Sequence, residues 1–237
     1  MNSERCPFYE IKTVTFCKAS PFKKMIPVDK SSAVKSRCNT INFEECSVYK
    51  EISNPEREIE NIRGFLLKYN YYFHPGHAWI SLLADDGKES RVGIDDFSQK
   101  LIGRIDKISF PSEGSTVKEN SLCFLVNSGR RSARIVAPAD GVIKEINQEV
   151  LSVPRRINLD PYNLGWIFSM HLTGDGIKGL FYGSNARKWL EYDIRRLHSI
   201  FASDLENTAT DGGESVEDIC SMLTDAQWSR IINLFLG

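Results

Sequence analysis

The sequence predicts an α+β protein in which a β-rich region is followed by amphipathic helices. From Tyr71 to Leu172 short apolar runs alternate with turn-forming residues, and many short strands at such spacing are typical of a barrel or a sandwich. Beyond residue 175 the apolar residues change to helical spacing, which predicts helices. The turns that divide the β-rich region are Asp85-Asp86-Gly87, Pro111 to Gly114 and Pro138 to Gly141.

The composition is that of a globular protein, because 41% of the 237 residues are apolar and can form a core. A net charge of -1 provides no global attraction for nucleic acid or for an anionic membrane. No apolar run reaches the roughly 18 residues of a membrane-spanning helix, and no export signal opens the chain. We therefore expect a soluble, cytoplasmic protein that binds no nucleic acid; the composition leaves its oligomeric state open.

Residues 1–50 form a separate segment with little apolar material of its own. Its four cysteines suggest a metal site, because zinc or an iron–sulfur cluster would supply the missing folding free energy. The segment lacks the C-x-x-C pair that is usual in such sites, so thiols that simply pack against the main domain are the alternative. The four residues are Cys6, Cys17, Cys38 and Cys46.

Residues 51–70 are predicted to form a helical brace. Asn54 can cap a helix whose first residue is Pro55. Apolar residues then recur at spacings of three and four, as on one face of a helix. They are Ile59, Ile62 and Leu66, which takes the predicted helix to about Lys68.

A hairpin with a basic tip is predicted between Phe124 and Val142. Its two apolar runs flank turn-forming residues, and a second turn closes its exit. Arginine forks pair with carboxylate or phosphate groups, so the tip is a candidate site for an acidic surface, an anion or a cofactor phosphate; solvated turn residues without a partner are the alternative. The candidate patch is Asn127, Ser128, Gly129, Arg130, Arg131 and Arg134.

Residues 176–237 are predicted to be a helical extension. Ser184 can cap a first helix, Ser215 a short second one, and Thr224 with Gln227 forms a capping box for a third. The helices either pack onto the β-rich region or present a partner-binding face. Their apolar residues are Leu190, Ile194, Leu197 and Phe201, then Val216, Ile219, Cys220 and Leu223, then Trp228, Ile231, Ile232 and Phe235.

No catalytic motif is present: the sequence contains no G-x-S-x-G, no Walker loop and no G-x-G-x-x-G. His74 and His77 could share a metal, but Pro75-Gly76 between them indicates a turn, and we expect structural roles for both. His171 and His198 are isolated. We therefore expect that the protein is not an enzyme.

Five short motifs follow one another in the β-rich region. They are His77 to Ile80; Arg91 to Gln99 with Leu101, Gly103 and Ile105; Phe110-Pro111 with Gly114 and Val117; Ala137 to Gly141; and Asn158 to Tyr162 with Gly165 to Phe168. In this order they resemble the H protein of the glycine cleavage system, with its His-Glu-Trp-Val, RVGITDYAQ, Leu-Pro-x-x-Gly-x-x-Val, Ser-Pro-x-x-Gly and Asn-x-Asp-Pro-Tyr segments.

The resemblance implies a lipoyl/biotinyl-type barrel-sandwich hybrid of two small antiparallel sheets over residues 71–175. In that family the hairpin tip, Glu-Ser-Val-Lys-Ala, carries lipoate on its lysine, and the arm shuttles an aminomethyl group and reducing equivalents between protein partners. The same resemblance places Arg130 at the position of this lysine.

Arginine cannot take the place of the lysine, because amide formation needs a deprotonated amine and a guanidinium stays protonated. The family's glutamate is also replaced, by Asn127, and the nearest lysines along the sequence, Lys118 and Lys144, lie outside the turn. We therefore expect no lipoate.

These observations favour a non-enzymatic binding or adaptor module that keeps the carrier fold and lacks the carrier chemistry. One alternative is a carrier of a group other than lipoate. Another is an electron-transfer accessory protein of a glycine cleavage or related redox complex, which uses the N-terminal cysteines as a metal site. Protein partners are expected in each case.

Overall fold

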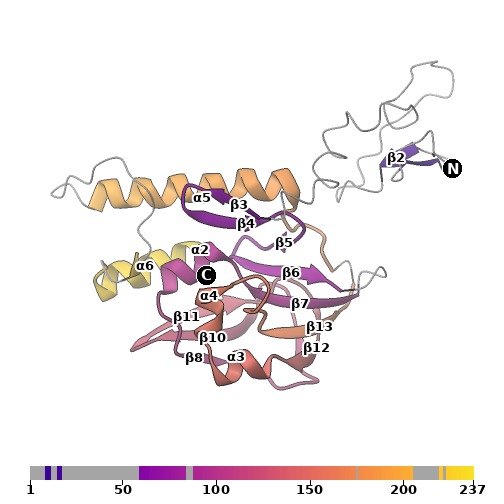
Figure 1. The fold of residues 1–237 in the computed structure, drawn as a ribbon, viewed down its shortest axis with the longest axis horizontal. Coiled ribbons are helices and arrows are strands. Elements are labelled where there is room, and N and C mark those ends of the chain that lie inside the picture. Colours follow the sequence, from indigo (N-terminus) through magenta and orange to yellow (C-terminus); the bar gives the residue numbers. More distant parts are fainter. Residues whose placement is uncertain are drawn as a thin grey trace, which may run out of the picture. The chain divides into compact units, whose positions relative to one another are not determined.

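The computed structural model describes residues 9–11, 15–17, 59–83, 88–174, 176–204, 219–220 and 223–237. The chain divides into two compact units, Met1–Glu58 and Ile59–Gly237. In the first unit, β1 (Tyr9–Ile11) pairs antiparallel with β2 (Thr15–Cys17). The second unit contains the other described elements (Figure 1).

The second unit begins with a β-hairpin of β3 (Ile59–Ile62) and β4 (Phe65–Lys68). The helix predicted for residues 51–70 is therefore wrong over this range; residues 51–58 lie outside the described chain. Arg63 and Gly64 both have positive φ, 51° and 88°, as a tight two-residue hairpin turn requires. The informative pattern was the alternation of the buried Phe65 and Leu67, because strands have a period of two.

Two antiparallel sheets form the β-rich region and confirm the predicted α+β class. The larger has six strands in the order β5-β6-β7-β13-β12-β9, and the smaller has three in the order β11-β10-β8. The larger sheet comprises β5 (Tyr72–Phe73), β6 (Ala78–Leu82), β7 (Glu89–Ile94), β9 (Thr116–Val117), β12 (Gly141–Ile146) and β13 (Phe168–Leu172). The smaller comprises β8 (Lys107–Ser109), β10 (Leu122–Ser128) and β11 (Arg131–Val136).

Three short helices connect the strands: α2 (Asp96–Ile102), α3 (Gln148–Ser152) and α4 (Arg156–Leu159). The first of them also anchors the β3–β4 hairpin. The backbone N–H of Leu66 donates to Asp96 Oδ2 at 2.8 Å, and the Leu66 carbonyl accepts from the Tyr162 hydroxyl at 2.6 Å. The hairpin is therefore part of the same core as the sheets.

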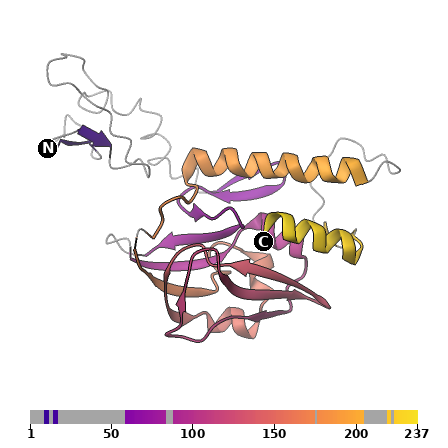
Figure 2. The same ribbon diagram turned by 180° about the vertical axis from the view of Figure 1, so that it is seen from behind.

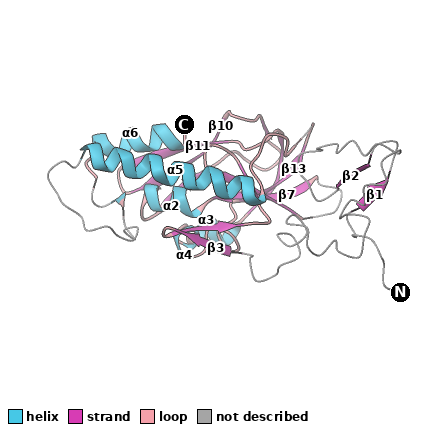
Figure 3. Cartoon of the chain, turned by 90° about the horizontal axis from the view of Figure 1, so that it is seen from above, coloured by secondary structure: helices cyan, strands magenta, loops and turns pink. Residues whose placement is uncertain are grey.

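The C-terminal helices α5 (Gly183–Asp204) and α6 (Asp225–Phe235) lie side by side (Figures 2 and 3). The predicted apolar residues Leu190, Ile194 and Leu197 are buried on α5, and Phe201 is half-buried. On α6 the buried residues are Trp228, Ile231, Ile232 and Phe235. Together they join one hydrophobic cluster with the β-rich region, which confirms that these helices pack onto it.

The predicted capping box at the start of α6 is also present. Thr224 accepts from the N–H of Gln227, and the Gln227 side chain accepts from the N–H of Thr224. In the helix that was predicted from Ser215, residues 215–218 and 221–222 lie outside the described chain. Ile219, Cys220 and Leu223 are buried.

Trp228 joins α6 to α2. Its indole is buried and its Nε1–H donates to the carbonyl of Leu101 at 2.9 Å. We expect Trp228→Ala to lower the free energy of unfolding by about 3–5 kcal/mol, because it leaves a cavity and an unsatisfied carbonyl. Chemical denaturation followed by circular dichroism measures this change.

Leu234→Ala is the control on the same helix, because Leu234 is 44% exposed and its truncation should change stability by no more than about 0.5 kcal/mol. Equal effects of the two substitutions would contradict the role given to Trp228.

Candidate functional site

The predicted hairpin consists of β10 and β11, and its tip is a two-residue turn. Ser128 pairs with Arg131, which leaves Gly129 and Arg130 to form the turn. Gly129 adopts φ 60°, a conformation that glycine tolerates best. Its N–H donates to Asp106 Oδ2 at 2.7 Å, so the turn is tied to the chain before β8. The side chain of Arg130 is exposed.

The hairpin presents different side chains on its two faces, because successive residues of a strand point in opposite directions. Val126 and Ala133 are cross-strand partners, are buried, and define the inner face. Arg131 is two residues before Ala133 and so lies on the inner side, at the end of the strand. Ser132 and Arg134 alternate with them and are exposed on the outer face.

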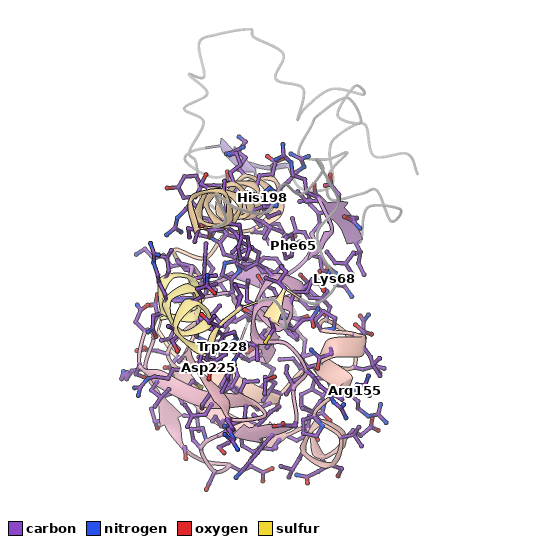
Figure 4. All side chains as sticks on the ribbon, turned by 90° about the vertical axis from the view of Figure 1, so that its left-hand side faces the viewer. Phe65, Lys68, Arg155, His198, Asp225 and Trp228 are labelled. Atoms are coloured by element: carbon purple, nitrogen blue, oxygen red, sulfur yellow. The ribbon has the colours of Figure 1, made fainter. Side chains whose placement is uncertain are left out.

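Arg131 binds the segment that leads into α6. Its Nε donates to Asp225 Oδ1 at 2.8 Å, and its two terminal nitrogens donate to the carbonyls of Cys220 at 2.9 Å and Leu223 at 2.6 Å. The guanidinium also lies 5.6 Å from the ring centre of Trp228, and Figure 4 shows Asp225 and Trp228 next to each other on α6. Arg131 thus connects the hairpin tip to the C-terminal extension.

The six residues of the predicted patch therefore divide between two faces. Arg130 and Arg134 are exposed, and Asn127 is half-buried on the outer face. Arg131 is half-buried and binds the C-terminal segment. The alternation of side chains along a strand predicts that Arg131 and Arg134, three residues apart, lie on opposite faces. The partners of Arg131 are distant in the sequence, since the contact with Asp225 spans 94 residues. No pattern near the hairpin could therefore identify them.

His77 lies at the centre of a buried cluster of charged side chains. It is fully buried, has φ 59°, and its ring stacks on Phe97 with centres 4.2 Å apart. Nδ1 is 2.7 Å from Asp95 Oδ2. Nε2 has no hydrogen-bond partner, and the nearest carboxylate oxygen, Oδ2 of Asp193 on α5, lies at 3.6 Å.

This cluster connects the β-rich region to α5. Burial lowers the pKa of His77, but the attraction of Asp95 and Asp193 outweighs it and raises the pKa to about 9. The ring is therefore an imidazolium at neutral pH. Asp95 also caps α2 by accepting from the N–H of Ser98 at 2.8 Å, and Asp193 pairs with Arg196 at 2.6 Å. His77 thus has the structural role that the sequence predicts.

The other three histidines lie in different parts of the fold: His74 follows β5, His171 is on β13 and His198 is on α5. His74 uses both ring nitrogens: Nδ1 accepts from Gly76 N–H at 3.0 Å and Nε2 bonds Asn120 Oδ1 at 2.9 Å. Burial lowers the pKa of His74. His171 pairs with Glu89 at 2.7 Å, and His198 is exposed on α5. Within the described part of the chain, no group of three metal-ligating side chains occurs.

Three of the four cysteines of the metal site predicted for residues 1–50 lie outside the described residues. Cys17 ends β2, and Cys6, Cys38 and Cys46 are not among the described residues. The metal site therefore stays a prediction. Cys123 and Cys220 are buried thiols, and burial raises the pKa of Cys123 to about 12.

Two antiparallel sheets with a hairpin at one end define the class of protein: a lipoyl-type barrel-sandwich hybrid. A family model described as "Glycine cleavage H-protein" matches residues 71–192. Because the match spans half of the chain, the protein belongs to the glycine cleavage H-protein family.

No helix among the described residues is long and apolar enough to cross a membrane.

Two relatives agree with the family match in sequence. A probable glycine cleavage system H protein of Aeropyrum pernix is 36% identical over 121 residues, which are 51% of this chain and 82% of the relative. The H protein of Carboxydothermus hydrogenoformans is 32% identical over 99 residues, 42% of this chain and 74% of the relative. A solved H protein from Mycobacterium marinum has 25% identity and a TM-score of 0.48, covering 54% of this chain and 98% of that one.

The contacts of Arg131 predict that Arg131→Ala loosens the C-terminal segment. The substitution removes the ion pair with Asp225 and the hydrogen bonds from Arg131 to the carbonyls of Cys220 and Leu223. We expect amide hydrogen exchange of residues 219–237 to accelerate at least several-fold while β6 and β7 keep their protection. Arg134→Ala, on the outer face, is the matched control and should leave this exchange unchanged. Unchanged protection in Arg131→Ala would disprove the anchoring role.

The charged cluster predicts a loss of stability at alkaline pH. The pKa of His77 is higher in the folded state, about 9, than its ordinary value of 6.5, so its contribution is complete below pH 6.5 and is lost as the pH rises through 9. At 1.36 kcal/mol per pH unit, the difference of about 2.5 corresponds to about 3 kcal/mol.

Asp193→Asn tests this pH dependence, because it keeps the shape of the side chain and removes its charge. We expect wild type to exceed the variant in free energy of unfolding by more at pH 6.5 than at pH 9.5, measured by urea denaturation. His198→Gln removes an exposed histidine and should leave the pH profile of wild type unchanged. A wild-type advantage that is the same at both pH values would refute the charged cluster.

Proposed function

We propose that this protein is a member of the H-protein family that is not lipoylated and serves as a non-enzymatic binding module. The observation that carries the proposal is the exposed Arg130 in the two-residue turn of the hairpin. A guanidinium keeps its proton and its delocalised charge, so it has no nucleophilic amine to acylate. The scaffold of the carrier is therefore combined with a tip that cannot hold the carrier's arm.

The lysines near the hairpin do not replace the missing attachment point. Lys107 on β8 pairs with Asn127 in the sheet, so it lies closer to the hairpin tip than its place in the sequence suggests. It belongs to a strand, however, and not to the turn. Spacing along the sequence does not reveal this proximity, because Lys107 lies 20 positions before Asn127. Lys118 is paired with Asp140 at 2.8 Å, and Lys144 lies on β12.

A non-catalytic role agrees with the family and with the histidines. H proteins are carriers and not catalysts, and they work through contacts with other proteins of their complex. In this chain both nitrogens of His74 are hydrogen bonded and His77 is enclosed between two aspartates. These residues support the fold, and we infer that partners contact residues on the surface of the protein.

The mass of the intact protein tests the proposal. After expression in cells that lipoylate their own H protein, we expect no mass increment of a lipoyl group on wild type. Arg130→Lys supplies an amine in the turn, and we expect a fraction of this variant to gain the increment. A co-expressed H protein that carries the family's lysine is the positive control.

Peptide mapping distinguishes the outcomes. A lipoyl group on wild type, at Lys107 or any other lysine, would overturn the proposal. In the variant, a lipoyl group anywhere other than residue 130 would contradict the assignment of Arg130 to the attachment position. The double variant Arg130→Lys with Lys107→Arg shows whether Lys107 is modified in place of the turn.

A further inference from the structure

The outer face of the three-stranded sheet collects side chains that point away from the core. The pairing register places Lys107, Asn127 and Ser132 in one row across the strands, and Ser109, Leu125 and Arg134 in the next. The intervening row is Ile108, Val126 and Ala133, all buried, which fixes the direction of the two outer rows. We call these two rows, together with Arg130 at the turn, the outer basic face.

The outer basic face is positively charged without compensation in the sheet. None of the residues of β8, β10 and β11 is acidic. Lys107, Arg130 and Arg134 are exposed and have no ion pair within the described part of the chain. The nearest acid along the chain is Asp106, and one of its oxygens accepts the N–H of Gly129. A chain with a net charge of -1 thus concentrates positive charge at one location.

The structure also holds this face in place before any partner binds. The inner side of the same strands is part of the core, and Arg131 fastens the end of β11 to Cys220, Leu223 and Asp225. The backbone positions that carry the exposed cations are therefore fixed, and a preorganised surface loses little entropy on binding.

The geometry points to the outer basic face as the docking surface for an acidic, extended segment of a partner protein. This inference rests on the proposed function, since a binding module needs a partner surface. Strands lie about 4.8 Å apart and alternate residues about 6.8 Å apart, so the Cα atoms of Lys107 and Arg134 are about 12 Å from each other. That spacing fits carboxylates distributed along a polypeptide better than one compact phosphate.

The remaining side chains also favour a polypeptide over nucleic acid. Asn127, Ser109 and Ser132 can hydrogen bond to backbone or carboxylate groups, and the half-buried Leu125 offers apolar contact. The two outer rows contain no aromatic residue, whereas binding of single-stranded nucleic acid relies on stacking of bases on aromatic rings.

Fluorescence anisotropy with a labelled acidic peptide tests the inference on the full-length protein. The probe is a peptide of about 12 residues in which Glu alternates with Ser, so that its carboxylates lie on one side when it is extended. We expect saturable binding by wild type. The triple variant Lys107→Gln, Arg130→Gln and Arg134→Gln should bind at least tenfold more weakly.

A second triple variant controls for net charge. Arg155→Gln, Lys188→Gln and Arg195→Gln make the same change in charge at exposed positions of the chain, and Figure 4 shows Arg155 well separated from Asp225, the residue that Arg131 binds. This variant should bind the peptide within twofold of wild type. Circular dichroism melting curves establish that both triple variants are folded.

Three outcomes would overturn the inference: no binding by wild type, equal losses in the two triple variants, or tighter binding of a single-stranded oligonucleotide of the same charge than of the peptide. A peptide with Gln in place of Glu should not bind. The result is independent of the lipoylation test, because a wild type that has no lipoyl mass and does not bind the peptide refutes only this inference, whereas a lipoyl mass refutes the proposed function.

Discussion

The second unit depends on a positive charge buried between two negative ones. His77 bonds Asp95 on one side and faces Asp193 on the other, and burial of an unpaired charge would be strongly unfavourable. Asp95 also caps the N-terminus of α2, and Asp193 belongs to α5. A single imidazolium therefore links a connecting helix and a C-terminal helix, and Trp189 and Phe97 enclose it with aromatic rings.

The hairpin places two neighbouring arginines in different roles. Arg130 and Arg131 are adjacent in sequence but have different surroundings. Arg130 is exposed in the turn, and Arg131 faces inward and binds the segment before α6. The hairpin is thus also a structural contact for the C-terminal extension.

Local patterns predicted the parts of the fold that depend on neighbouring residues. The hairpin at Gly129, the capping box of Thr224 and Gln227, and the apolar face of α5 each follow from residues a few positions apart. The helix predicted over residues 59–68 was wrong because two periodicities overlap there. Ile59, Ile62 and Leu66 fit a helical period, whereas Phe65 and Leu67 fit the period of a strand and are the residues that are buried. The contacts of Arg131 with Asp225 and of His77 with Asp193 join distant parts of the chain, and one sequence contains no signal for such pairs.

The length of α5 has a consequence for where the domain ends. The family match stops at residue 192, whereas α5 continues to Asp204 and supplies Asp193 as its next residue. A fragment cut at the family boundary would end inside a helix, remove one of the two carboxylates beside His77 and uncover the surface of α2 that Trp228 occupies. The family match and the compact unit Ile59–Gly237 thus have different limits in this protein, and the C-terminal extension is a component of the domain and not an appendage to it.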